Sequence, residues 1–256
     1  MATSLDVDKL ERAVKSVYRD VATDPGAGYH FDTGRSLAEH LGYAPADLDR
    51  IPSAALESFA GVGYYFDLAA IEPGDDVLDL GSGSGTDAFV AALQAGETGS
   101  VTGLDMTEAQ LEKSRVLAEE AGFETVRFER GYIEDLPFED GSFDVVISNG
   151  VINLSPDKEA VFAEAHRVLG PDGRLAIADI ISEELMPKSI KTDEELWAAC
   201  IGGAEQVDRY SSLIEAAGFE LVELRENEQY EFRSEQAASA CQKYGVKSVS
   251  LAADRT

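Results

Sequence analysis

Residues 76–87 contain a glycine-rich turn that narrows the possible folds of this chain to a few. An apolar run leads into Gly81, Gly83 and Gly85, which stand at every second position, and a second apolar run of helical character follows them. Glycine adopts backbone angles, and permits a close approach of ligand, that a Cβ atom forbids. A helix that begins here points its free N–H groups back towards the turn. The stretch therefore predicts a strand, a turn and a helix that bind a nucleotide-like ligand at the edge of an open α/β sheet.

Two carboxylates near the turn indicate which nucleotide it binds. A dinucleotide site needs glycine at the first, third and sixth positions, so that a pyrophosphate can rest on the helix N-terminus, but the sixth position here is Thr86. Asp79 precedes the turn and Asp87 lies inside the helix. Carboxylates repel a pyrophosphate and suit a ligand with a cationic end, such as S-adenosylmethionine, which has an ammonium, a sulfonium and no phosphate. We therefore predict S-adenosylmethionine as the cofactor, and we include Ser82 of the turn in its site.

The charge of the chain excludes several classes of partner. Its 256 residues include 49 acidic and 21 basic ones, for a formal net charge of −28. Nucleic acids need Lys and Arg to neutralise their phosphates, and anionic membranes repel an acidic surface, so we expect neither as a partner. The acidic residues are spread along the whole chain, which suits a protein at high salt, where screening weakens self-repulsion. A halophile-like protein is our hypothesis, and an ordinary acidic protein is the alternative.

Cysteine usage and hydropathy indicate a soluble, cytoplasmic protein. No stretch approaches the roughly 20 apolar residues of a membrane helix, and the N-terminal residues lack the apolar core of a signal peptide. The two cysteines, Cys200 and Cys241, are too few for a disulfide framework and fit a reducing compartment. The sequence leaves the oligomeric state open, and it suggests no metal site.

Strands and helices are expected to alternate through the middle of the chain. This alternation predicts an α/β fold with a doubly wound, mostly parallel, Rossmann-like sheet, closed at one edge by an antiparallel strand.

Thr107 and Gln110 are expected to form a capping box for the helix that follows them. The expected strands are 76–80, 100–104, 125–129, 143–148, 174–181, 219–224 and 247–251. The main expected helices are 8–22, 35–41, 46–50, 52–59, 111–121, 193–200, 208–217, 234–244 and one beginning at 155. The expected parts are a helical cap that lies over the ligand end of the sheet (1–70), a cofactor-binding α/β core (71–185), and C-terminal helices and edge strands that complete the sheet (186–256).

Residues at the carboxyl ends of the strands are the candidates for ligand contacts, because such sheets bind ligands there. Asp105 ends the second strand, twenty residues after Gly85, the distance at which a carboxylate meets ribose hydroxyls in nucleotide-binding βαβ units. NAD and S-adenosylmethionine both contain that ribose, so Asp105 indicates adenosine without choosing between them. Met106 follows it and is placed to lie against the adenine face.

The next two strands end in further candidates. Ile133 is placed to pack on adenine, and Glu134 to accept a hydrogen bond from its amine. Asn149 and Gly150 follow the fourth strand and face the expected position of the reacting group of the ligand.

At these residues the chain resembles class I S-adenosylmethionine-dependent methyltransferases, and more narrowly the arsenite methyltransferase family. The resemblance covers nearly the whole chain from about residue 35. The family's chemistry, methyl transfer from the sulfonium to trivalent arsenic, is what the resemblance implies. The segments that carry it are 37–52, 61–63, 77–85, 103–107, 131–138, 148–158, 173–180 and 200–204. The cofactor contacts that it implies are at Asp79, Gly81, Gly83, Gly85, Asp105, Met106, Ile133, Glu134 and Asn149.

The chain departs from this family at the substrate. The family holds arsenic on cysteine thiolates, and at the corresponding positions this chain has Val62, Gly150 and Cys200. The family's N-terminal cysteine pair is also missing, because residues 29–32 contain no cysteine. A soft acceptor such as trivalent arsenic is held by several thiolates, so either the arsenic arrives already bound to small thiols or the substrate is another small molecule, such as a quinone-like ring.

The remaining substrate candidates each have a structural alternative. Cys200 is either the substrate thiolate or a small buried hydrophobe. Tyr64 and Tyr65 either stack on the sulfonium or substrate or belong to the core, and His30 is placed to line a substrate pocket. The sequence shows no general base, which favours a soft or already ionised nucleophile. A non-enzymatic S-adenosylmethionine-binding protein and an NAD(P)-linked oxidoreductase remain as further alternatives.

Overall fold

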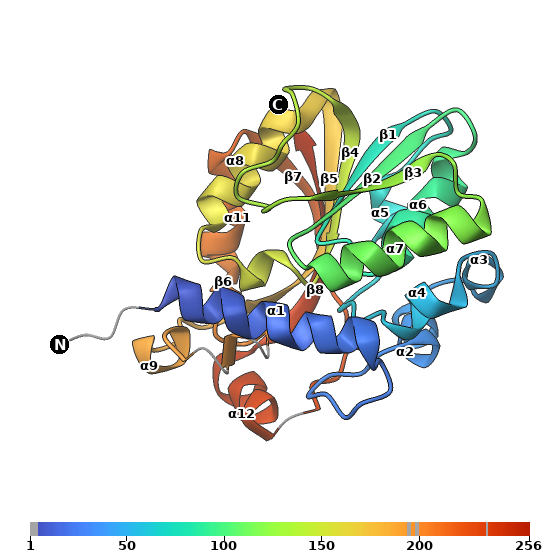
Figure 1. The fold of residues 1–256 in the computed structure, drawn as a ribbon. Helices are drawn as coiled ribbons and strands as arrows, with labels where there is room; N and C mark the ends of the chain where they lie inside the picture. Colours follow the sequence, from blue (N-terminus) through green and yellow to red (C-terminus); the bar gives the residue numbers. More distant parts are fainter. Residues whose placement is uncertain (1–4, 194–195, 198–199, 234) are drawn as a thin grey trace.

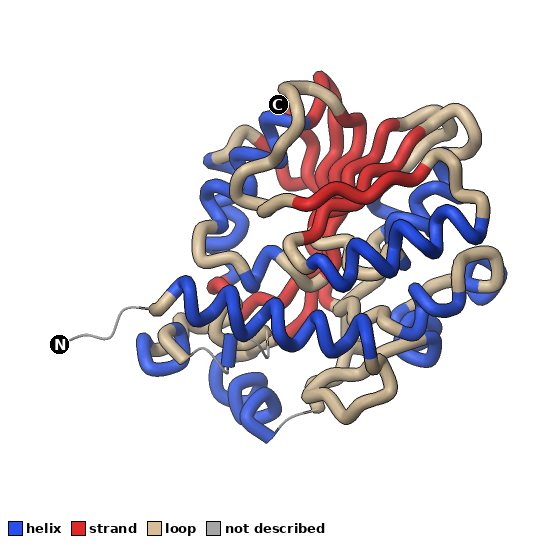
Figure 2. Tube along the Cα trace, viewed as in Figure 1, coloured by secondary structure: helices blue, strands red, loops and turns tan. Residues whose placement is uncertain are grey.

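The centre of the molecule is a twisted sheet with helices on both faces (Figures 1 and 2). The structure is a computed structural model that describes residues 5–193, 196–197, 200–233 and 235–256. Within these residues the sheet has eight strands, in the order β3-β2-β1-β4-β5-β8-β7, with β6 paired to the end of β5. The strands are β1 (Asp76–Leu80), β2 (Ser100–Asp105), β3 (Val126–Arg130), β4 (Phe143–Asn149), β5 (Leu169–Ser182), β6 (Glu205–Gln206), β7 (Phe219–Glu226) and β8 (Lys247–Arg255).

The pairing of the strands confirms the predicted fold class. β1 to β5 pair in parallel, so their carboxyl ends meet at one edge of the sheet. β8 pairs antiparallel with both β5 and β7, as expected for the closing edge. The apolar strand residues alternate between the two faces: Val77 belongs to one buried cluster, and Leu78 and Leu80 belong to another. Burial on both faces explains the continuous apolar run of residues 145–147 in β4.

Most of the expected helices are present, with shifted ends, and some short elements had no clear sequence signal. Asp157 caps α8 by accepting from the Ala160 N–H at 3.0 Å, so the helix begins at Lys158 and not at residue 155. β5 already begins at Leu169, five residues before the expected start of this strand at residue 174. The helices are α1 (Val7–Thr23), α2 (Arg35–Leu41), α3 (Pro45–Leu48), α4 (Ser53–Glu57), α5 (Phe66–Ala69), α6 (Thr86–Ala95), α7 (Glu108–Ala121), the 3₁₀ helix η1 (Ile152–Leu154), α8 (Lys158–Val168), α9 (Lys188–Lys191), α11 (Val207–Ala216) and α12 (Glu235–Tyr244).

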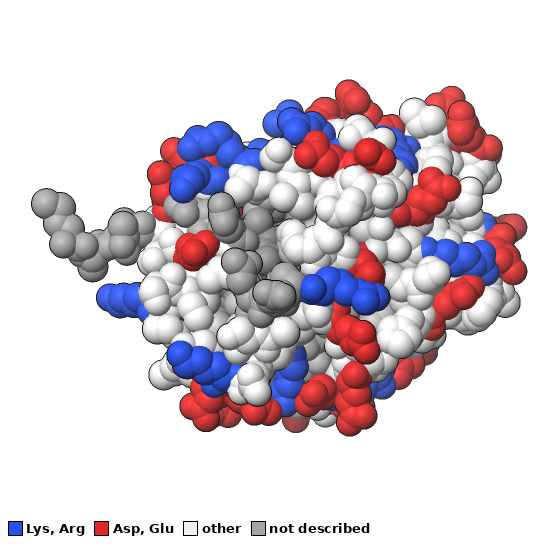
Figure 3. Space-filling view, turned by 90° about the horizontal axis from the view of Figure 1, so that it is seen from below, with Lys and Arg blue, Asp and Glu red and all other residues white. Residues whose placement is uncertain are grey.

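The expected helices 193–200 and 234–244 include residues 194–195, 198–199 and 234, which lie outside the described residues. Among the helices of the described part, none has both the length and the apolar character that crossing a bilayer requires. On the face seen in Figure 3, Lys and Arg side chains lie among Asp and Glu side chains. Arg225 and Asp67 form an ion pair with an N–O distance of 2.6 Å.

Helix α1 positions the site. Asp6 caps it by accepting from the Lys9 N–H, and its apolar stripe, including Leu10 and Val14, is buried. The helix runs past the carboxyl edge of the parallel strands and packs against α7 (Figure 1). It therefore covers the region to which the glycine turn belongs.

Candidate functional site

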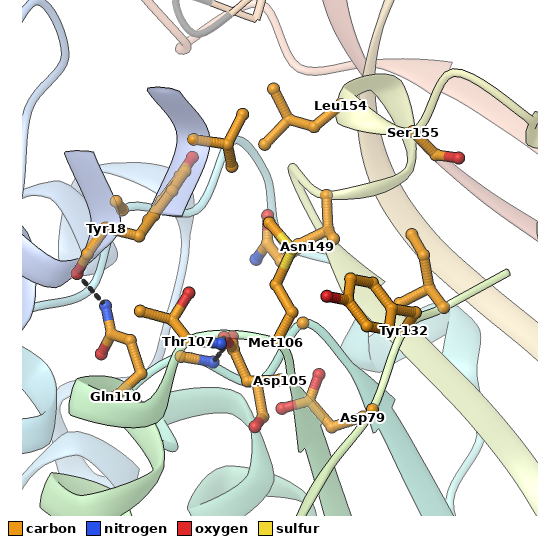
Figure 4. A pocket seen from close by; sticks show the side chains of 18 of the residues that line it. Tyr18, Asp79, Asp105, Met106, Thr107, Gln110, Tyr132, Asn149, Leu154 and Ser155 are labelled. Carbon is orange, nitrogen blue, oxygen red and sulfur yellow. Dashed lines mark hydrogen bonds between the residues drawn. The ribbon is translucent and has the colours of Figure 1, made fainter. Parts of the chain in front are cut away.

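A cavity of about 330 Å³ lies at the carboxyl ends of β1, β2 and β4, with α1 forming one wall (Figure 4). Its volume is at the lower end of the range for small-molecule sites. Most of the predicted cofactor residues line it, although they come from four separate segments of the chain. The predicted residues in the lining are Asp79, Gly81, Ser82, Gly83, Asp105, Met106, Ile133, Glu134 and Asn149.

Asp79 brings an unsatisfied buried carboxylate to this cavity. Its side chain is only 2% exposed, and although the Ala88 N–H donates to the carboxylate, Oδ2 has no hydrogen-bond partner among the described residues. Burial, followed by the charges of Asp87 and Asp105, raises the pKa of Asp79 well above its usual range. A buried carboxylate in this state is stabilised by a cation, so this oxygen favours a positively charged ligand group.

Asp105 ties the glycine turn to the end of β2. Its Oδ2 accepts from the Gly83 N–H at 3.0 Å and its Oδ1 accepts from the Thr107 N–H at 2.7 Å. Burial raises the pKa of Asp105, while these bonds act in the opposite direction. The carboxylate is thus held in one orientation beside the cavity and keeps acceptor capacity for hydroxyl groups, because each carboxylate oxygen can accept more than one bond.

Asp87, in contrast, is already satisfied by neutral donors. The Tyr43 hydroxyl donates to its Oδ1 at 2.6 Å, and the Tyr65 hydroxyl and Asn149 Nδ2 donate to its Oδ2 at 2.9 and 3.0 Å. Asn149 Oδ1 in turn accepts from the Val62 N–H at 2.7 Å. The Asn149 amide therefore fixes the loop before β1 to the first turn of α6, in addition to lining the cavity.

The loops after β3 and β4 meet on the opposite side of the cavity. Glu134 accepts a hydrogen bond from the Ser155 hydroxyl, and both residues line the cavity. The Tyr132 hydroxyl donates to Glu11 Oε1 of α1 at 2.8 Å, and Lys15 Nζ donates to the Tyr132 oxygen at 3.0 Å. These contacts connect the predicted adenine side of the site to α1.

The predicted capping box was wrong, and its two residues serve the site instead. Thr107 makes no side-chain cap bond at the start of α7, and its side chain bonds to Asp105. Gln110 is 2% exposed; its Oε1 accepts from the Ser84 hydroxyl at 2.5 Å, and its Nε2 donates to the Tyr18 carbonyl at 2.9 Å. Figure 4 shows this second bond reaching α1.

Several predicted site residues lie outside the cavity lining. Gly85 lies at the start of α6 with a φ of +96°, and a Cβ there would lie 2.7 Å from the Phe128 ring. Tyr65 is fully buried and bonded to Asp87, and His30 contacts the Phe31 ring edge-on. The predicted residues that the cavity lining does not include are Gly85, Tyr64, Tyr65, Gly150, His30 and Cys200.

The three positions where the related family has thiolates do not form a thiol site here. A Cβ on Gly150 would lie 3.1 Å from Val62 Cγ1, so these two positions adjoin each other but carry no sulfur. Cys200 is 7% exposed, and its thiol interacts with Tyr18 and Asn153; burial raises its pKa to about 12, which keeps the thiol protonated at neutral pH. Among the described residues, no group of three His, Cys, Asp or Glu side chains is arranged to hold a metal ion.

The sequence placed α1 within a helical cap over the ligand end of the sheet, but it named no residue of α1 as a site candidate. Its inward face supplies Leu10, Glu11, Val14 and Tyr18 to the cavity. Helical spacing predicted that this face is buried, but spacing contains no information about which surface the face covers. Only the packing of α1 beside α7 decides which of its side chains border the cavity.

Comparisons with known proteins identify the fold and its family. A family model of the methyltransferase domain matches residues 71–218. The arsenite methyltransferase of Halobacterium salinarum is 40% identical over 92% of this chain and 64% of its own length, and that of Aquipseudomonas alcaligenes is 45% identical over 59% and 45%. The crystal structure of CrArsM, an arsenic(III) S-adenosylmethionine methyltransferase from Chlamydomonas reinhardtii, superposes with a TM-score of 0.70 at 37% identity, covering 82% of this chain and 72% of that one. The chain thus spans about half to two thirds of the length of these two curated relatives.

These similarities confirm the resemblance that the motifs predict. The family model matches more than half of the chain. The matched segment contains the glycine turn, Asp105 and the strand ends around the cavity. The chain belongs to the methyltransferase-domain family, and along most of its length it is similar to arsenite methyltransferases.

Proposed function

We propose that this protein is an S-adenosylmethionine-dependent methyltransferase that methylates a small acceptor, namely arsenite or an arsenic–thiol conjugate. The observation that carries the cofactor is Asp79 Oδ2, a buried carboxylate oxygen without a partner among the described residues, in a cavity beside the glycine turn. The similarity to arsenite methyltransferases over 92% of the chain supports the acceptor.

The residues of the cavity fit this cofactor. Asp79 would take its ammonium, Asp105 its ribose hydroxyls, and Glu134 its exocyclic amine, with Met106 and Ile133 against the adenine. A dinucleotide fits less well, because Asp79 lies close enough to Asp87 and Asp105 to feel the charge of both, and these buried carboxylates would repel a pyrophosphate. Once bound, S-adenosylmethionine supplies a methyl carbon activated by a positively charged sulfur.

The protein's own contribution is position and exclusion of water. Asp105 and the Gly83 N–H fix the turn, and the apolar side chains of Leu10 and Val14 on α1 cover one side of the cavity. A lone-pair nucleophile such as arsenic or sulfur needs no general base. The cavity volume of about 330 Å³ suits the cofactor with a small acceptor.

The lack of cysteines at Val62 and Gly150 limits the form in which arsenic could be the acceptor. Val62 and Gly150 adjoin each other without sulfur, and Cys200 lies outside the lining of the cavity. Arsenic bound beforehand to small thiols would bring its own soft ligands, and we propose this form as the substrate. Both cysteines are free, in accordance with a reducing, cytoplasmic setting where such thiols are abundant. The same observation favours a second candidate, a methyltransferase for another small molecule such as a quinone-like ring.

Product analysis tests the acceptor. The protein is incubated with methyl-labelled S-adenosylmethionine and arsenite, with and without excess glutathione, and methylated arsenicals are separated by chromatography. We expect methylated product that depends on glutathione. The absence of methylated arsenic above the protein-free control would reject arsenite and leave the second candidate, which a panel of phenolic and quinol acceptors then examines.

Calorimetric titration tests the cofactor independently of the acceptor. We expect binding of S-adenosylmethionine to the wild-type protein and to Asp135→Asn, which neutralises an exposed carboxylate, but not to Asp79→Asn. Tight binding of NAD(P)H without binding of S-adenosylmethionine would instead indicate an oxidoreductase. Binding of S-adenosylmethionine without turnover of any acceptor would indicate a non-enzymatic binding protein.

A further inference from the structure

Helix α1 is attached to the walls of the cavity by polar contacts from α7 and from the loop after β3. Gln110 Nε2 donates to the Tyr18 carbonyl at 2.9 Å, and Lys113 Nζ donates to the Ala22 carbonyl at 3.0 Å. On the other side, the Tyr132 hydroxyl donates to Glu11. Because α1 also lines the cavity, its position determines how completely a bound ligand is enclosed. We call the packed position of α1 against α7 and the loop after β3 its seating over the cavity.

Gln110 differs from the other residues that hold α1, because its side-chain amide bonds to the glycine turn with one end and to α1 with the other. Its Oε1 accepts from the Ser84 hydroxyl in the glycine turn, and its Nε2 donates to Tyr18 in α1. Lys113 contacts α1 and the Ser58 hydroxyl, neither of which belongs to the glycine turn. Among these attachments, Gln110 is therefore the one that contacts both the turn and α1.

The surroundings of Gln110 make this connection stiff. The side chain is 2% exposed and Ser84 is 4% exposed, so water competes little for either bond. An amide has its acceptor and its donors at fixed positions on one planar group. A rotation of the amide that follows a shift of Ser84 therefore also moves the donor that holds Tyr18.

We propose that Gln110 is a positioning residue that couples occupancy of the glycine turn to the seating of α1 over the cavity. The proposal rests on the cofactor assignment made above, since the occupant of the turn is S-adenosylmethionine or its product. A ligand that fixes the position of Ser84 strengthens the two hydrogen bonds of Gln110 and thereby keeps α1 in its seated position over the cavity. By reciprocity, seated α1 raises the affinity of the turn for the ligand by the same factor.

Hydrogen–deuterium exchange with and without S-adenosylhomocysteine measures this coupling directly. In the wild type we expect the ligand to slow exchange both at the turn and along α1, in α1 by about tenfold, which is within the usual range for coupled sites. Gln110→Glu keeps an acceptor for Ser84 but loses the donor to Tyr18, and Ser84→Ala removes the other contact. In both variants we expect slowing at the turn to remain and slowing in α1 to fall below about twofold.

Lys113→Met is the matched control. It removes an attachment of α1 that has no contact with the turn, so exchange in α1 becomes faster without ligand while the tenfold effect of ligand remains. Retention of the full ligand effect on α1 in either Gln110→Glu or Ser84→Ala would overturn the proposal, as would wild-type protein that binds ligand at the turn without slowing α1. If Gln110→Glu does not fold, Ser84→Ala decides alone.

These outcomes separate the coupling from the function. Wild-type protein that shows no effect of S-adenosylhomocysteine at the turn contradicts the cofactor assignment, and the coupling with it. Wild-type protein with an effect at the turn alone contradicts only the coupling. Kinetics provide a second readout: loss of seating raises KM for S-adenosylmethionine in Gln110→Glu more than in Lys113→Met.

Discussion

Asn149 Nδ2 and Asp87 Oδ2 are joined by a hydrogen bond of 3.0 Å that links the end of β4 to the first turn of α6. Burial raises the pKa of Asp87, and the bonds from Tyr43, Asn149 and Tyr65 counteract this rise. The two residues are far apart in sequence but share one polar network, which places the loop before β1 beside the cavity.

Removal of this bond is expected to destabilise the fold. Asn149→Ala leaves Asp87 Oδ2 with one donor fewer and frees the Val62 N–H, so we expect a loss of about 1–3 kcal/mol in the free energy of unfolding, the cost of unsatisfied buried polar groups. Urea denaturation measures it. The matched control is Gln94→Ala, which shortens a half-buried amide side chain near the other end of α6 and is expected to stay within about 0.5 kcal/mol of wild type. Equal losses in both variants would contradict a special role for the network.

Asp79→Asn is expected to stabilise the ligand-free protein while it abolishes cofactor binding. Because the pKa of Asp79 is raised in the folded state, its contribution to stability is fully present below the unfolded pKa and is lost as pH rises through the folded pKa. The advantage of Asp79→Asn over wild type therefore grows with pH across that interval. Denaturant unfolding at a series of pH values checks this, and an advantage that shrinks with pH would contradict it.

Affinity for S-adenosylmethionine should rise with pH over the same interval. The ammonium of S-adenosylmethionine pairs with ionised Asp79. At any pH where Asp79 is protonated in the ligand-free protein, binding therefore releases a proton. Calorimetry in two buffers of different ionisation enthalpy detects this proton. Asp135→Asn should show the same release as wild type, whereas affinity that is independent of pH would argue against Asp79 as the ammonium partner.

Cys200→Ser separates a substrate thiolate from a buried core residue. If arsenite is methylated and Cys200 binds it, the variant loses activity while Cys241→Ser retains it. The raised pKa of Cys200, about 12, means that any such role requires the substrate to displace the thiol proton. Full activity in Cys200→Ser would remove this residue from the site.

High salt is expected to stabilise the protein. With a net charge of −28, repulsion within the folded state weakens as salt shortens the Debye length to about 3 Å at 1 M. We expect the melting temperature to rise between dilute buffer and molar KCl. Greater stability in dilute buffer would contradict a halophile-like protein.

Elements with local sequence signals could be predicted without the structure. Val145, Val146 and Ile147 form a continuous apolar run, which is the pattern of a strand buried on both faces. The glycines after Leu80 mark the turn. Strand ends in a parallel sheet meet at one edge, so Asp79 and Asp105 were predicted to lie together, and both line the cavity.

The contacts by which distant segments complete the site follow from the packing of the folded chain. Gln110 looked like half of a capping box, because Thr107 stands at the right spacing, but its amide bonds to Ser84 and to a carbonyl 92 residues away in α1. Likewise, Cys200 was a candidate for the substrate site, and its position outside the cavity lining follows from the packing of Tyr18 and Asn153 around its thiol. The spacing of residues along a chain indicates its helices and strands and which face of each is buried. The partner of a polar group depends instead on which distant segments the packing brings within hydrogen-bond distance.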